Sequence, residues 1–465
     1  MQARPSFSQR RTWERGRSLL FGALACLGRH TVSGLLCATG QQFVDWSAAY
    51  RLFEARRFDP EALFSPVRTA VLERLKQAMP VIASLDDTLV YKRGRKVAGA
   101  SWRRDPLGPP FRPNFSWAQR FVQISLLLPT QGAPGPARAI PADLVHAPTA
   151  KKPSQNDPPE LWEEYRQKQK QMRTSQVGSE RIAHLRTALD DDERSQAREL
   201  LVAVDGGYAN QTFLRELPAK TTVVARIRKD ARLFSEPAPS APKRGRRRLY
   251  GERLPTPEEL RHDESIPWMK VEAFAAGAAH TFEVKRVGPV RSTTTGEKDV
   301  QIVIIRPLAY RPKKGARLLY RDPAYLLCTD PDLPIETLLQ AYLWRWEIEV
   351  NFREEKTILG MGEAQVRTES AAALAPSFVA AAYGMLHAAA AQADITESGL
   401  PLPKWRRNQP PRRASTTALI NRLRADLWTQ ALGLNKNGFA ATANDRRSPL
   451  NSQPHLASAV CYAER

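Results

Sequence analysis

The chain has 465 residues and a strong positive charge, with 70 Lys and Arg against 48 Asp and Glu and a formal net charge of +22. A chain of this length can bury a large core and is expected to form two or three domains. The charge excess points to a polyanion, of which DNA or RNA is the usual one. The four cysteines are scattered with no Cys-x-x-Cys pair. This pattern argues against a disulfide framework or a zinc knuckle and suggests a reducing compartment.

Residues 1–78 are predicted to be helical and form the first domain. An apolar stripe runs through Leu19, Leu20, Leu24 and Leu27, and Thr31 could cap a second helix. Two short helices joined at residues 28–31 would suit a helix-turn-helix that binds DNA. The alternative is an ordinary helical cap on the next domain, and the sequence leaves both open.

From residue 80 the pattern changes to buried strands. Val81–Val90 is the first strand and contains two adjacent aspartates and a threonine, Asp86-Asp87-Thr88. Further strands are predicted at 121–128, 139–146, 200–205 and 221–227, with two helices within 160–189 and one at 210–217. The fourth strand, 200–205, ends at Asp205. After the fifth strand, 221–227, about a hundred residues precede the next predicted helix, with strand-like runs at 268–274, 281–287, 300–306 and 325–329.

A helix is predicted from Pro334 to about Gly360. At about 100° per residue, Arg345, Glu349 and Lys356 lie within roughly 60° of Tyr342, so four polar side chains share one stripe. Nearly every other direction is apolar, through Trp344, Trp346, Ile348, Val350 and Phe352. This pattern predicts that these side chains are buried and that the charges are paired or bound to a ligand. The alternative is a solvated helix face.

The spacing of these four residues is also a signature. Tyr, two residues, Arg, three, Glu, six, Lys resembles the Tyr-Arg-Glu-Lys motif of DDE insertion-sequence transposases of the IS-four superfamily. The resemblance implies an α/β protein with a ribonuclease-H-like catalytic core, an all-β insertion before the Glu-bearing helix, and an N-terminal helical domain. The expected divisions are 1–78, 79–228 (first part of the core), 229–333 (insertion), 334–395 (core completion) and 396–465 (basic, Pro-rich C-terminal region and tail).

The resemblance gives Asp87, Asp205 and Glu349 as the catalytic triad that holds two Mg²⁺ ions, with Mn²⁺ as a substitute. Asp87 is chosen because the first aspartate of the family directly precedes Thr. Asp86 remains the alternative, since neighbours on a strand point to opposite faces. Two ions suit this chemistry, because one activates the attacking oxygen and the other stabilises the leaving oxygen.

DNA contacts are expected from several residues. Arg345 can grip a phosphate bidentately, Lys356 supplies a point charge and Tyr342 can donate a hydrogen bond. A basic loop containing Arg246 and Arg247 would add non-specific phosphate affinity. Trp268 could stack on a flipped base, although burial in the β-rich region is the simpler interpretation.

The sequence therefore predicts a transposase that binds the ends of an insertion sequence and catalyses DNA strand cleavage and strand transfer. Its expected partners are double-stranded DNA, as element ends and target, and a second copy on that DNA. The alternatives are a ribonuclease-H-like nuclease that does not join strands and an inactive DNA-binding descendant. No signal peptide is evident, and we interpret the Ala-rich run 371–391 as a core helix. The expected location is the bacterial cytoplasm, on the nucleoid when DNA is bound, with no membrane partner.

Overall fold

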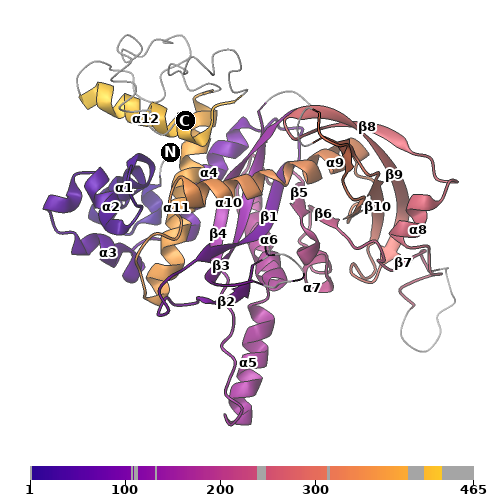
Figure 1. Cartoon of the computed structure of the whole chain (residues 1–465), viewed down its shortest axis with the longest axis horizontal. Coiled ribbons are helices and arrows are strands. Elements are labelled where there is room, and N and C mark those ends of the chain that lie inside the picture. Colours follow the sequence, from indigo (N-terminus) through magenta and orange to yellow (C-terminus); the bar gives the residue numbers. More distant parts are fainter. Residues whose placement is uncertain are drawn as a thin grey trace.

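The computed structural model describes residues 3–431, except 106–107, 109–110, 112–113, 131–133, 238–247, 312–314 and 396–412. One large mixed sheet runs through the molecule, with helices against both of its faces and a group of helices at one end (Figure 1). The expected α/β class is confirmed.

The elements follow the chain in an order close to the predicted one. The helices are α1 (Arg10–Ala25), α2 (Val32–Ala38), α3 (Ser47–Glu54), α4 (Pro60–Arg74), α5 (Pro159–Gln171), α6 (Thr174–Asp190), α7 (Gln211–Leu214), α8 (Pro257–His262), α9 (Ile335–Trp344), α10 (Glu347–Thr357), α11 (Glu369–Gln392) and α12 (Thr416–Ala431). The strands are β1 (Val81–Tyr91), β2 (Ser101–Arg104), β3 (Phe115–Pro129), β4 (Ala137–His146), β5 (Leu200–Val204), β6 (Thr221–Arg226), β7 (Leu233–Phe234), β8 (Met269–Ala275), β9 (Ala278–Ser292), β10 (Asp299–Ile305), β11 (Ala309–Tyr310), β12 (Leu319–Tyr320) and β13 (Ala324–Cys328).

The sheet has the strand order β2-β3-β1-β5-β6-β13-β10-β9-β7, with β4 paired to β3 and β8 paired to β9. Strand β1 is antiparallel to β3 and parallel to β5, and β5 is parallel to β6. The later strands join through β13, which pairs antiparallel with β6. Most of the β-rich segment before α9 therefore extends the same sheet, and only β11 and β12 pair with each other in a separate two-stranded sheet.

The two faces of the sheet carry different helices because successive side chains on a strand alternate between them. On one face, Ile82 and Leu201 pack with Leu338 and Leu339 of α9. On the other, β1 and β5 pack against α6 and α7, in a core that includes Val81, Ala83, Leu85, Val202, Ile182, Leu185 and Phe213. Strand β5 is buried along its whole length.

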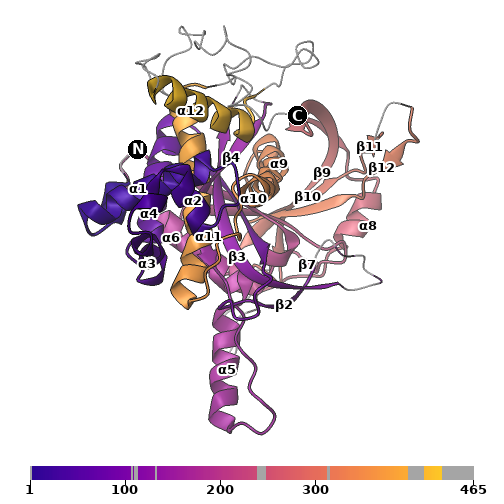
Figure 2. The same cartoon turned by 60° about the vertical axis from the view of Figure 1, so that its left-hand side comes forward.

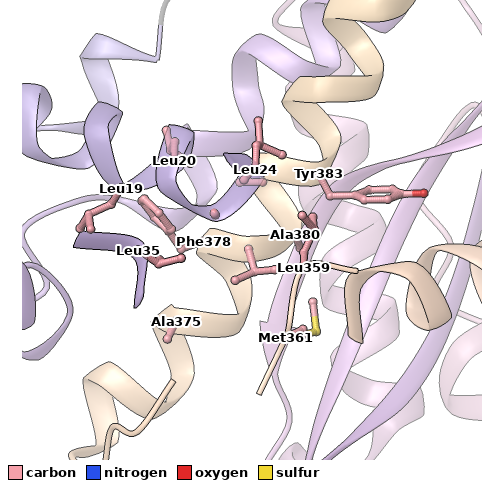
Figure 3. Packing of buried hydrophobic residues seen from close by; sticks show 14 of the residues in the cluster. Leu19, Leu20, Leu24, Leu35, Leu359, Met361, Ala375, Phe378, Ala380 and Tyr383 are labelled. Atoms are coloured by element: carbon pink, nitrogen blue, oxygen red, sulfur yellow. The ribbon is translucent and has the colours of Figure 1, made fainter. Parts of the chain in front are cut away.

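The N-terminal helices pack around α11 (Figures 1 and 2). Leu19, Leu24 and Leu35 lie near Phe378 and Ala380 of α11 in Figure 3. By length and apolarity α11 could cross a membrane, but 89% of its most apolar window is buried inside the protein. It is the core helix that the sequence indicated. The segment between α1 and α2 is held to this core, since the His30 backbone N–H donates to Glu363 Oε2 at 2.6 Å.

The single helix predicted from Pro334 to about Gly360 is observed as two helices, α9 and α10, joined by a tight turn. Arg345 and Trp346 lie between α9 and α10, and the backbone N–H of Glu349 donates to Trp346 O three residues back. The prediction that Trp346 is buried is wrong, because its side chain is 62% exposed at this tight turn. Gly360 ends the segment in the left-handed region with φ +60°, and an added Cβ would lie 2.6 Å from His30 Cβ.

Candidate active site

The middle of β1 faces α10 through its even-numbered residues. Lys356 Nζ donates to Thr88 Oγ1 at 2.6 Å, and Arg345 Nη1 lies 3.4 Å from Asp86 Oδ2. Asp87 lies between Asp86 and Thr88 in the strand and points to the opposite face of the sheet, as strand alternation requires. There its Oδ1 is 3.5 Å from the hydroxyl of Tyr208.

Arg345 connects the two elements that carry the candidate carboxylates. Its Nη1 is 3.4 Å from Asp86 Oδ2 and 3.5 Å from Glu349 Oε1, and the arginine side chain is only 11% exposed. Its Nε is buried with no hydrogen-bond partner among the described residues. These contacts are long for charge-assisted hydrogen bonds, which are usually about 2.7–2.9 Å. The cation therefore neutralises the carboxylates without fully satisfying either.

Asp205 directly follows β5, the parallel neighbour of β1, and adds negative charge to the same region. Burial and then the carboxylates of Asp87 and Asp205 raise the pKa of Asp86 to about 7, against the opposing effect of Arg345. Burial also raises the pKa of Glu349, where Arg345 opposes the rise and Asp205 adds to it. Asp205 therefore acts electrostatically on both Asp86 and Glu349.

Asp87 has a different set of neighbours. Burial raises its pKa, while Arg120, the Tyr208 hydroxyl and Arg103 lower it. Asp205 also raises it, so this carboxylate is not isolated from the group. The geometry nevertheless places Asp86, and not Asp87, beside Arg345. The sequence prediction took Asp87 as the first carboxylate of the triad and kept Asp86 as the alternative.

The other residues of the helix signature surround this group. The Tyr342 ring lies against Arg345, with 5.8 Å from the guanidinium carbon to the ring centroid. Burial raises the pKa of the Tyr342 hydroxyl. Burial lowers the pKa of Lys356, and Glu355 opposes that shift. All four signature residues therefore lie at the face of β1 that carries Asp86.

The remaining predicted DNA contacts fall elsewhere. Trp268 is half-buried at the β-rich end, where Lys285 Nζ lies 4.7 Å from its ring centroid and the Arg306 guanidinium carbon lies 5.6 Å away. Trp268 therefore packs within the β-rich region, which the sequence analysis gave as the alternative to base stacking. Arg246 and Arg247 lie outside the described residues.

Sequence reasoning missed a buried polar group on α10. Asn351 is 2% exposed and donates to Ala139 O at 3.0 Å, and Glu355 is fully buried. The Gln123 amide nitrogen, in the orientation that satisfies both ends of the amide, lies 3.2 and 3.3 Å from the Glu355 carboxyl oxygens. A signal was present, because Asn351 and Glu355 are four residues apart and share a helix side with Ile348 and Phe352.

The chain was compared with known proteins once this geometry was established. A family model described as DDE superfamily endonuclease matches residues 4–287. The match includes Asp86, Asp87 and Asp205 and ends before α9 and α10. No curated protein matches the chain. Because the matched segment is more than half of the sequence, the chain belongs to the DDE superfamily of endonucleases.

Proposed function

We propose that this DDE endonuclease is a transposase that binds the ends of an insertion sequence, cuts DNA and joins the freed end to a target. The observation that carries the proposal is the Arg345 contact with Asp86 of β1 and Glu349 of α10, within the field of Asp205. The Tyr-Arg-Glu-Lys spacing supports the IS-four subfamily, and the order of β1, β3, β4, β5 and β6 supports a ribonuclease-H-like core.

Members of this superfamily generally use divalent metals, and the side chains present are of the right kind. Among the described residues, no three His, Cys, Asp or Glu side chains come together closely enough to hold a metal. The donor set still fits, because Asp86, Asp205 and Glu349 supply the hard oxygens that Mg²⁺ prefers, and Asp205 raises the pKa of both Asp86 and Glu349. We propose these three as the metal carboxylates, with Asp87 as the alternative to Asp86. Two Mg²⁺ or Mn²⁺ ions would supply activation of the attacking oxygen and charge stabilisation at the leaving oxygen.

Arg345 and Lys356 each have two kinds of partner, the neighbouring side chains of the protein and the phosphates of DNA. Without metal, Arg345 neutralises Asp86 and Glu349, and Lys356 donates to Thr88. If Asp86 and Glu349 held metal, the Arg345 guanidinium would be available to a DNA phosphate, which it can grip bidentately. Lys356 and the Tyr342 hydroxyl can then hold neighbouring phosphate oxygens. Grip on the product distinguishes a transposase from a hydrolase, because the cut 3′ end must stay bound until target DNA arrives.

The test uses the full chain and the DNA that flanks its own gene. We expect nicking at the element ends with Mg²⁺ or Mn²⁺, none without metal, and joining of the 3′ end to a target duplex. Glu349→Gln should keep DNA binding and lose both reactions, whereas Glu336→Gln, at an exposed position on α9, should keep both. Nicking without joining under either metal would identify a plain nuclease. Binding without nicking would identify an inactive DNA-binding descendant. Sedimentation of the DNA complex would show whether two copies bind.

A further inference from the structure

The free edge of the sheet carries an exposed group of aromatic side chains. Strand β2 is the last strand at this end, and its Trp102 is 64% exposed. Phe115, at the start of β3, is 58% exposed. Trp102 and Trp117 form an edge-to-face pair with ring centroids 5.7 Å apart. Exposed rings of this size usually mark a contact surface when they gather in one place.

The same edge is strongly basic. Between residues 91 and 105 there are six Lys and Arg and one Asp. Four of these cations are exposed: Arg93, Arg95, Lys96 and Arg104. The single acid, Asp105, interacts with the Tyr91 hydroxyl. This surface, Trp102, Arg104, Phe115 and Trp117 with the adjoining loop 93–96, is called the edge surface below.

The edge surface lies on the side of the sheet that holds Asp86. Trp102 pairs with Trp117, and six residues further along β3 Gln123 pairs with Asp86. Because every second residue on a strand shares a face, Trp117, Gln123, Trp102 and Asp86 point to the same side. Six residues of strand span about 20 Å, which is at most about six nucleotides at the spacing of a duplex.

The chemistry of the edge surface favours one partner. Clustered cations fit phosphates, but a duplex keeps its bases stacked and leaves exposed rings without a role. Unpaired bases can stack on such rings, and this combination of cations and aromatic side chains is typical of single-strand binding. A second copy of the chain fits poorly, because each copy carries a formal charge of +22 and would present the same cations.

We propose that the edge surface binds an unpaired DNA strand beside the cleavage site, with bases stacked on Trp102 and Phe115. This inference rests on the proposed function, because the first nick is what frees a strand to leave the duplex. The exposed cations hold the phosphates of that strand, and the rings hold its bases. The site of cleavage and the edge surface then engage the same DNA molecule on one side of the sheet.

The test measures DNA affinity by fluorescence anisotropy in EDTA, so that no cleavage is needed. One probe is a blunt duplex of an element end, and the other is the same duplex with a single-stranded flank of about ten nucleotides. Trp102→Ala and Phe115→Ala should each weaken binding of the flanked probe about tenfold or more and leave the blunt probe unchanged. Trp102→Phe, which keeps an aromatic ring, should retain most of the wild-type affinity for the flanked probe. Tyr320→Ala, at a ring 66% exposed on β12, is the matched control and should change neither affinity.

Several results would overturn the proposal. Equal losses on both probes would mean that the rings serve duplex binding or the fold, and thermal unfolding of the variants separates those two. Unchanged affinity for the flanked probe, or a change in sedimentation of the free protein, would exclude the single-strand role, and the latter would identify a protein interface. If wild-type protein binds the flanked probe as expected but never nicks DNA, the proposed transposase function fails while the edge surface stands.

Discussion

The two sides of α10 are built differently. On the side toward Asp86, Arg345 contacts Asp86 and Glu349 at 3.4 and 3.5 Å. On the side toward α11 and the C-terminal segment, Tyr383 donates to Glu354 at 2.7 Å and Arg413 donates to Glu347 at 2.8 Å. Carboxylates two to five residues apart on the same helix therefore have long contacts on one side and short ones on the other.

We infer from this difference that the carboxylates on the Asp86 side are available to a ligand, whereas those on the α11 side fix the position of the helix. Glu354 accepts from both Tyr383 and Thr416 through Oε2, and its Oε1 lies 3.7 Å from Arg353 Nη2, so this carboxylate already has partners within the protein. Glu349 is 36% exposed and shares a single guanidinium with Asp86. Fixing one side of a helix firmly is a way to keep the opposite side in a productive position for catalysis.

The largest expected effect tests which aspartate belongs to the catalytic side. Asp86→Asn should reduce nicking a hundredfold or more, since losing a metal-ligating oxygen costs at least as much as losing a group that supports one. Asp87→Asn, the matched variant on the opposite face, should cost less than tenfold. Single-turnover nicking on one labelled substrate measures both, with a gel shift to confirm DNA binding. The reverse order would return the role of first carboxylate to Asp87.

The next effect concerns Glu355, on the buried side of α10. Burial raises the pKa of this carboxyl to about 8, against the opposing effects of Gln123 and Lys356. The native state therefore keeps a proton that the unfolded chain loses near its ordinary value of 4.5. Stability should fall as the pH rises from about 4.5 to about 8, by about 1.4 kcal/mol for each unit of difference in pKa.

Glu355→Gln removes this proton linkage at nearly constant shape. The variant should match wild type below about pH 4.5 and exceed it by a few kcal/mol above pH 8. Urea unfolding across this range is the measurement, and Glu336→Gln, at an exposed acid on α9, is the control. Stability curves for Glu355→Gln and wild type that run parallel at all pH values would show that the carboxyl titrates normally.

A smaller effect separates joining from nicking. Lys356 lies on the catalytic side and donates to Thr88 when no DNA is bound. Lys356→Ala should release the cut end about ten- to a hundredfold more readily, which corresponds to a charged hydrogen bond of about 1.5–3 kcal/mol. Joining should therefore fall more than first-strand nicking, as measured on nicked and pre-cleaved substrates. Equal losses would mean that Lys356 acts before the first cut.

Much of the fold could be predicted because the strands are apolar runs between clear turns. The strands predicted at Val81–Val90 and at residues 200–205 agree within one residue with β1 and β5, because an apolar run of this length between turns is typical of a strand buried on both faces. Strand β2 was missed because Ser101–Arg104 is short and mostly polar, and its pairing with β3 is a long-range contact. The extension of the sheet through β13 is also long-range and left no local signal.

The site was harder to predict at Asp86 and Asp87, because adjacent residues of a strand face opposite sides of the sheet. Alternation shows that Asp86 and Asp87 face opposite sides, but only tertiary packing shows which side α10 covers. The helical wheel did place Arg345, Glu349 and Lys356 on one side of the helix, and these residues do lie toward β1. It placed Trp346 in the buried set because a uniform 100° step does not allow for the tight turn at Arg345.

The smallest expected effect tests whether the firm side of α10 supports the catalytic side. Arg413 donates to Glu347 of α10 and, at 2.8 Å, to Ala137 O of β4. Both side chains of the ion pair are partly exposed, so the pair should contribute only about 0.5–1 kcal/mol to stability. Arg413→Ala should therefore leave global unfolding almost unchanged. It should still increase hydrogen exchange along residues 347–357 and lower the nicking rate a few-fold.

A double-mutant cycle separates the ion pair from other effects of the substitution. Arg413→Glu and Glu347→Arg each break the pair, and the double variant restores it with the charges exchanged. If the pair positions α10, the double variant should recover exchange protection and nicking together. The Arg413 hydrogen bond to Ala137 O is not restored in the double variant, because Arg413 is replaced. Recovery of neither would show that the charge pair does not position α10. In that case Thr416, which donates to Glu354, becomes the residue that holds the firm side of the helix.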